Sequence, residues 1–161
     1  MHGYQHTRLN LAVLAPLWAV GLAAGRAPDV HLFGAGYLIG TLLITPDLDL
    51  RFNDAARRWG VLRFVWTPYH LLSRHRGMSH TYLLGPLSRL LYLTAWVVPL
   101  LLLGGAVQLK DLTPLHLAST SPGPVLAALQ VMAGYLVSQW MHLMADGIWP
   151  FMPARASRRR A

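Results

Sequence analysis

Four long apolar stretches constrain this chain more than any other feature of its sequence. They run over residues 9–25, 30–46, 81–106 and 123–148. A helix needs about 20 mostly apolar residues to cross the hydrocarbon core of a bilayer, with ~17 as the lower limit. Charged residues make up only 12% of the chain, about half of their usual share in soluble domains. The pattern predicts one all-α domain over residues 1–161, an integral membrane bundle of four transmembrane helices.

Small residues and prolines indicate how these stretches pack and bend. Gly36 and Gly40 lie four positions apart in the second stretch and allow a close approach to a neighbouring helix. We interpret them as ordinary helix packing without a functional role. Pro86 and Pro99 lie inside the third stretch, where proline removes a backbone donor and favours a kink. The third stretch is therefore either one kinked helix or two shorter helices.

The positive charges are distributed unevenly between the two sides of the predicted membrane. The side with both termini and the loop over 51–76 carries eleven arginines, whereas the opposite side carries only Arg26 and Lys110. Because short loops rich in lysine and arginine stay in the cytoplasm, this asymmetry predicts a multi-pass protein of the inner (cytoplasmic) membrane with both termini cytoplasmic. The net charge of +8 is then explained by topology and by contact with anionic membrane lipid.

The loop over 51–76 mixes arginines with aromatic residues, a pattern typical of an interfacial helix on the inner leaflet. Its aromatic side chains are then expected at headgroup depth. Two interpretations of its basic residues remain open. They anchor the loop to lipid, which is the commoner case, or Arg74 and Arg76 bind a phosphate group of a substrate. Nucleic acid ranks last among the partners, because the chain has no nucleic-acid recognition motif.

The predicted topology brings seven ionisable side chains to the cytoplasmic ends of the four helices. These are His6, Asp47, Asp49, His75, His80, His142 and Asp146. His142 and Asp146 are four residues apart and share one helix face. Asp47 and Asp49 follow a proline, so they should leave the second helix, where their carboxylates could bridge two ions. Ionisable residues at membrane depth usually serve function, and their convergence on one side favours a shared site over independent hydrogen-bonded pairs.

The chemistry of these side chains suits a metal. The chain has no cysteine, so thiolate sites are excluded. Imidazole and carboxylate ligands favour zinc, manganese or iron, and zinc is our first choice. A catalytic zinc site uses three protein ligands, so seven candidates could serve two ions.

The runs TPDLDL (45–50), RHRGMSH (74–80) and GYLVSQWMHLMAD (134–146) resemble a family of uncharacterised metal-binding membrane proteins from bacteria and archaea. They are also similar to the related YdjM-like family of inner-membrane metal-dependent hydrolases. Both families are grouped, on distant similarity, with zinc-dependent phospholipase C, an all-helical enzyme with clustered zinc ions. The resemblance implies the same seven residues as the metal-associated set. Leu50 stands where YdjM-like proteins typically have histidine.

These observations lead to two expectations for function. The first is a membrane-embedded, metal-dependent hydrolase of a phosphoester or phospholipid, with Asp47 or Asp49 as general base and Arg74 and Arg76 against the phosphate. The second is a non-catalytic metal-binding protein that acts as a scaffold, sensor or carrier. The sequence leaves the substrate, the number of ions and the oligomeric state open.

Overall fold

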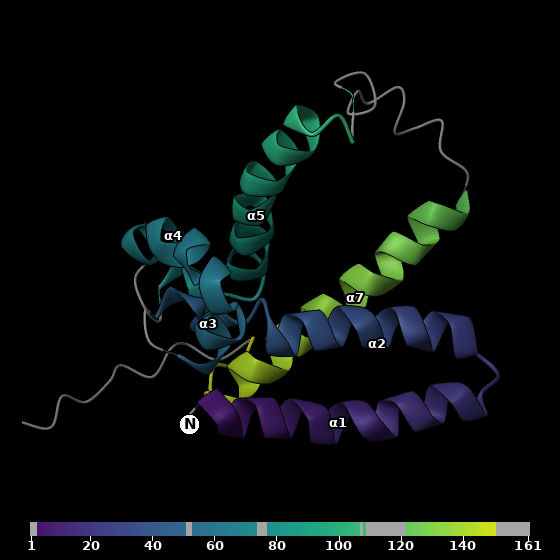
Figure 1. The fold of residues 1–161 in the computed structure, drawn as a ribbon. Helices are drawn as coiled ribbons and strands as arrows, with labels where there is room; N and C mark the ends of the chain where they lie inside the picture. The colour runs from purple at the N-terminus through teal and green to yellow at the C-terminus, as the bar shows by residue number, and fades with distance from the viewer. Residues whose placement is uncertain (1–2, 51–52, 74–76, 107, 109–121, 151–161) are drawn as a thin grey trace, which may run out of the picture.

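The computed structural model describes residues 3–50, 53–73, 77–106, 108 and 122–150. Within these ranges the chain is all-α and contains no β-strand. Its elements are α1 (Gly3–Ala23), α2 (Ala27–Leu42), the 3₁₀ turn η1 (Pro46–Asp49), α3 (Asp54–Arg58), η2 (Gly60–Trp66), α4 (Thr67–Leu72), η3 (Met78–His80), α5 (Leu84–Leu103) and α7 (Pro122–Ala145). One long helix corresponds to each of the four predicted apolar stretches, and short helices connect α2 to α5 (Figure 1).

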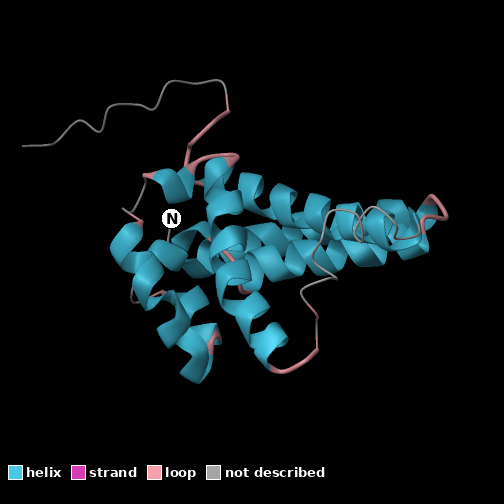
Figure 2. Cartoon of the chain, turned by 90° about the horizontal axis from the view of Figure 1, so that it is seen from above, coloured by secondary structure: helices cyan, strands magenta, loops and turns pink. Residues whose placement is uncertain are grey.

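α1 and α2 form an antiparallel pair joined by a tight turn at Gly25. This glycine has a φ of 70°, a left-handed conformation that residues with a Cβ rarely adopt. The backbone amide of Arg26 donates to the carbonyl of Gly21, which satisfies one of the free carbonyls at the end of α1. Both helices contact α7, so that α1, α2 and α7 form a three-helix body (Figures 1 and 2).

Glycines bring α2 and α7 so close that their backbones touch. A Cβ at Gly36 would collide with the backbone carbonyl of Val131. A Cβ at Gly134 would collide in the same way with the carbonyl of Phe33, and one at Gly40 would collide with side chains of α7. The structure therefore confirms that the small residues of the second stretch serve close helix packing.

α5 is one continuous helix despite its two prolines. Pro86 lies in its first turn, where the missing amide would have no intrahelical partner, and Pro99 lies close to its end. The third apolar stretch thus forms a single long helix, preceded by the short η3. Toward its C-terminal end α5 leans away from α7 (Figure 1).

Among the described residues, two segments are long and apolar enough to cross a membrane. They are Ala27–Asp49, with a mean hydropathy of 1.3, and Leu84–Leu103, with a mean hydropathy of 1.6. α1 and α7 do not meet the same criterion, since polar residues such as Asn10, Gln139 and His142 lie within them. The architecture is therefore all-α with two candidate spans, rather than a clear bundle of four.

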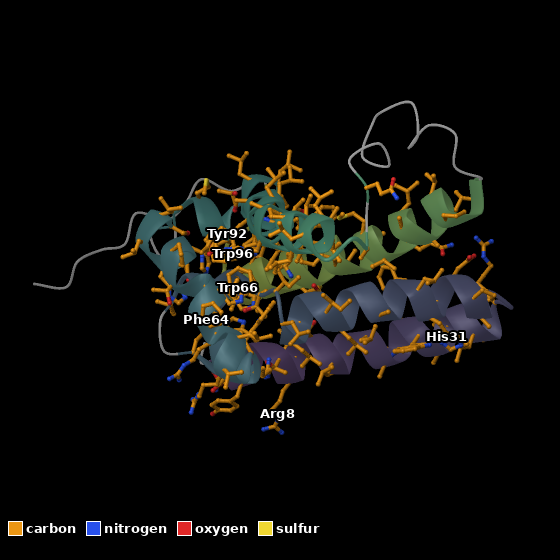
Figure 3. The ribbon with its side chains drawn as sticks, turned by 45° about the horizontal axis from the view of Figure 1, so that its top comes forward. Arg8, His31, Phe64, Trp66, Tyr92 and Trp96 are labelled. Carbon is orange, nitrogen blue, oxygen red and sulfur yellow. The ribbon has the colours of Figure 1, made fainter. Side chains whose placement is uncertain are left out.

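The short helices between α2 and α5 fold around a buried aromatic cluster. Trp66 is fully buried, and its ring centroid lies 5.6 Å from that of Tyr69 and 5.6 Å from that of Tyr92 of α5 (Figure 3). Trp66 and Tyr69 therefore contact other residues of the protein, whereas the depth of the loop's aromatic residues in a membrane stays a prediction. Packing against α5 removes the apolar area of Trp66 and Tyr69 from the surroundings. Phe64, by contrast, is 58% exposed.

Candidate metal centre

Asp47 lies in η1, a 3₁₀ turn that begins where proline ends the helical path of α2. Thr45 has an extended backbone (φ −87°, ψ 161°), because a residue before proline is excluded from the helical region. The side-chain amide of Asn53 donates to the carbonyls of Asp47 and Leu50. The same side chain caps α3, so one residue fixes the turn that carries Asp47 and Asp49.

His80 is held beside this turn by the residue before it. The hydroxyl of Ser79 donates to the carbonyl of Pro46 at 2.9 Å, which ties η3 to η1. His142 lies in the last turn of α7, and Asp146 follows the helix end with its amide on the carbonyl of His142. Three separate segments of the chain thus present ligands at the same end of the fold.

Four side chains converge there: Asp47, His80, His142 and Asp146. The Nε2 atom of His142 lies 3.4 Å from Oδ1 of Asp47 and 3.6 Å from Oδ2 of Asp146. The Nε2 atom of His80 lies 3.9 Å and 3.8 Å from the same two oxygens. One donor atom from each residue lies within 4.8 Å of the others. His142 and Asp146 therefore share one helix face, as their spacing predicts.

Two further predicted residues contact this cluster from outside. Oδ2 of Asp49 lies 3.5 Å from Nδ1 of His80, on the opposite side of the imidazole from the cluster. Nε2 of His6 lies 3.1 Å from Oδ1 of Asp146, and the His6 ring stacks on that of His142 at 4.0 Å. Both residues are therefore placed to orient a ligand, the position that outer carboxylates and hydrogen-bond partners occupy around metal-binding histidines.

A divalent ion fits this donor set. In tetrahedral zinc sites the ligand atoms lie about 2.0–2.2 Å from the metal, which places neighbouring ligand atoms roughly 3.4 Å apart. The nitrogen-to-oxygen distances of 3.4 to 3.9 Å are close to that separation. His142 is 3% exposed, and its Nε2 faces carboxylate oxygens of Asp47 and Asp146 at 3.4 and 3.6 Å, distances longer than those of a good hydrogen bond. An ion between these groups would be coordinated by the imidazole nitrogen and the carboxylate oxygens directly.

Asp146 lies beyond the end of α7, and the surroundings of its carboxyl group lower its pKa and so favour the ionised form. Burial alone would raise its pKa. The hydrogen bond and the charge of His6, with smaller contributions from His142 and His80, outweigh burial and lower the pKa of Asp146 to about 2. The site therefore offers an ionised carboxylate to a cation at neutral pH.

A small polar pocket adjoins the cluster on the side of α1. It has a volume of about 10 Å³, which is room for roughly one water molecule. The residues that line it are Gly3, His6, Thr7, Asn10, Thr41, Thr45, Asp47, Asp54, Ala55, Arg58 and His142. Asp47 and His142 belong to both the pocket and the cluster, so a small molecule in the pocket would contact the metal ligands directly.

Some predicted residues lie elsewhere. His75, Arg74 and Arg76 fall outside the residues that the structure describes. His31, which the predicted topology places on the side opposite the seven candidate residues, is at the far end of the three-helix body beside Trp18 (Figure 3).

The structure also places buried polar residues near the site that the sequence argument missed. Asn10 of α1 donates to the backbone of Ser138 and to Thr41, which joins α1, α7 and α2 one turn from His6. Arg89 of α5 is fully buried. Only Arg89 carried a recognisable signal, since an ionisable residue within an apolar stretch usually has a specific role.

Comparison with known proteins agrees with this geometry. A family model described as an uncharacterised metal-binding protein family, DUF2227, matches residues 1–156. An uncharacterised protein of Aquifex aeolicus (strain VF5) is 51% identical over 61 residues, which cover 38% of this chain and 43% of that relative. No solved structure matched the chain. The chain belongs to the DUF2227 family of uncharacterised metal-binding proteins.

Proposed function

We propose that this chain is a membrane-embedded, metal-dependent hydrolase that acts on a phosphoester at the cytoplasmic face of the inner membrane. The observation that carries the proposal is the position of the polar pocket against Asp47 and His142, two members of the four-residue cluster. The pocket has room for about one water molecule beside these ligands, and hydrolysis needs a water in that position. The similarity of the three motifs to the YdjM-like hydrolases supports the same reaction class.

The surface of α5 supports the membrane part of the proposal. Only 11% of its most apolar window is buried, although its mean hydropathy is 1.6. Leu91, Leu100 and Leu103 are 69%, 64% and 86% exposed. Soluble monomers rarely expose an apolar surface of this extent, which favours hydrocarbon as the environment of α5. The lower hydropathy of α1 and α7 fits helices whose polar faces line the site.

The residues present can be assigned roles in hydrolysis. A divalent ion in the cluster, zinc in our proposal, would supply Lewis acidity that lowers the pKa of water and polarises a phosphoryl oxygen. Oδ1 of Asp47 faces the cluster and Oδ2 lies toward Gly3 of the pocket lining, so we assign Oδ2 the role of accepting the proton of a water there. Asp49 faces His80 instead, so we assign it the orientation of that imidazole.

Metal content of the detergent-purified protein is the first test. Mass spectrometry should find bound zinc or another divalent metal in the wild type and in His31→Ala, whose imidazole lies far from the site. His142→Ala should lose it. Equal loss from both variants, or no metal in the wild type after metal is added back, would contradict the site.

Turnover is the second test. Metal-loaded protein should cleave a model phosphodiester or a phospholipid, and Asp47→Asn should abolish cleavage. Asp29→Asn is the matched control, because Asp29 pairs with Arg26 at the other end of the fold. No cleavage above the Asp47→Asn background on these substrates would contradict the hydrolase assignment while leaving the metal site intact.

A non-catalytic metal site is the second candidate, and the burial of the histidines favours it. His6, His80 and His142 are at most 5% exposed, and they join α1, η3 and α7. An ion held by such residues stabilises the fold directly. A chelator that lowers the melting temperature of a protein without turnover would support this candidate.

A further inference from the structure

Arg89 is the most deeply buried cation that the structure describes. Its exposed fraction is 0%. Its Nη1 donates to the backbone oxygen of Ser79 at 2.9 Å and to the hydroxyl of Ser79 at 3.0 Å. Its Nη2 donates to Oε1 of Gln139 at 2.8 Å. One guanidinium thus connects α5 with η3 and α7.

This burial is not explained by charge pairing or by packing. None of the ion pairs among the described residues joins Arg89 to a carboxylate. A buried cation loses its hydration, and apolar residues of similar volume usually give equal or greater stability at such positions. Filling space would therefore be served better by leucine or methionine. The specific feature of arginine is its planar set of donors, which can hold several acceptors in fixed geometry.

Each acceptor leads to a different ligand of the candidate metal centre. Ser79 directly precedes His80, and its hydroxyl donates a hydrogen bond to the carbonyl of Pro46 at 2.9 Å. Pro46 in turn precedes Asp47 in the sequence. Gln139 lies three residues before His142 on α7, and its amide nitrogen donates to the carbonyl of Gly40 on α2 at 3.1 Å. Arg89 is therefore linked, through one or two hydrogen-bonded residues, to the segments that carry His80, Asp47 and His142.

We propose that Arg89 is a positioning residue of the metal centre, which sets the separation of His80, Asp47 and His142 through Ser79 and Gln139. The inference rests on the proposed metal site and extends it to α5, a helix that carries none of the four cluster residues. The ion affinity then depends on α5, although no side chain of α5 belongs to the four-residue cluster. Outer partners of metal ligands typically change metal affinity 10- to 100-fold when they are removed.

Cobalt(II) binding to the full-length protein in detergent tests the proposal, because its visible spectrum reports both affinity and ligand geometry. Ser79→Ala removes the hydroxyl link to Arg89 and Pro46 and keeps the backbone oxygen. Arg89→Lys keeps the charge and loses the planar fork. Ser88→Ala is the matched control, since Ser88 is the neighbour of Arg89 on α5 and contacts Tyr69 and Gly85 instead. Melting temperatures of the metal-free proteins are measured alongside.

We expect Ser79→Ala and Arg89→Lys to weaken cobalt binding by tenfold or more and to alter the visible spectrum, with Ser88→Ala unchanged. Wild-type affinity and spectrum in both variants, with only a lower melting temperature, would show a structural role and overturn the inference. Should Arg89→Lys fail to fold, Ser79→Ala alone decides between these outcomes. A wild type that binds no cobalt would contradict the proposed metal site itself, and this inference with it.

Discussion

Asp47 and Asp49 are separated by one residue yet face different neighbours. The turn of η1 directs Oδ1 of Asp47 toward both imidazoles of the cluster and leaves its side chain 16% exposed. The side chain of Asp49 is fully buried against Nδ1 of His80. A carboxylate in that position fixes the tautomer and orientation of the histidine and leaves the other nitrogen for the ion.

Substitution of the two aspartates should therefore have effects of different size. Asp47→Asn should abolish zinc binding, because an amide is a poor ligand for zinc. Asp49→Asn should retain binding with an affinity 10- to 100-fold lower. Competition with a chromophoric chelator measures both. Complete loss of zinc in Asp49→Asn would show that Asp49 is itself a ligand.

His6 offers a similar separation of roles. His6→Phe keeps an aromatic ring stacked on His142 and removes the hydrogen bond to Asp146. We expect roughly tenfold weaker metal binding with an unchanged number of ions per chain. Calorimetric titration gives both quantities. One ion fewer per chain in His6→Phe than in the wild type would place His6 among the ligands instead.

The convergence of the four cluster residues could be predicted from sequence, whereas the residues that hold them in place could not. The four-residue spacing of His142 and Asp146 predicts that they lie close together, and Asp47 stands out because it follows a proline at the end of an apolar stretch. Nothing in the sequence tells which nitrogen of an imidazole faces the ion, because that depends on contacts between segments far apart in the chain. Nothing in the sequence distinguishes Gln139 and Ser79 from other polar residues, because their bonds to Arg89 form only in the folded protein.

At the scale of helices, the contact between α2 and α7 should tolerate almost no added volume. Gly36→Ala should lower the free energy of unfolding by about 1–3 kcal/mol, since the new Cβ meets a backbone carbonyl that cannot rotate away. Gly123→Ala is the control on α7. A Cβ there meets nothing within 4 Å, so its effect should stay within about 1 kcal/mol. Thermal or denaturant unfolding in detergent measures both, and equal effects would contradict the close contact.

The helices themselves were predictable, because long apolar stretches leave the chain few alternatives. The segment between α2 and α5 was not. Trp66 stands among arginines, which is typical of an interfacial residue, but it packs inward against Tyr92. The aromatic partner lies 26 residues further along the chain, so no local pattern could reveal the contact.

At the scale of the whole molecule, the exposed apolar faces and the charge asymmetry predict how the chain is oriented across the membrane, and this orientation can be tested. The chain has no cysteine, so single cysteines report position without background. With both termini cytoplasmic, a membrane-impermeant maleimide should label Arg26→Cys on intact spheroplasts and Arg57→Cys only after lysis. The reverse pattern would invert the topology, and labelling of both on intact spheroplasts would contradict a membrane-spanning arrangement.

The cluster draws on segments that the ribosome makes at very different times. Asp47 and His80 are made well before His142 and Asp146, which come with and directly after the last described helix. A nascent chain therefore holds only part of the coordination set until α7 has docked against α2. Ion capture would then be a late event in biogenesis, and a metal-loaded chain would be one whose assembly has been completed.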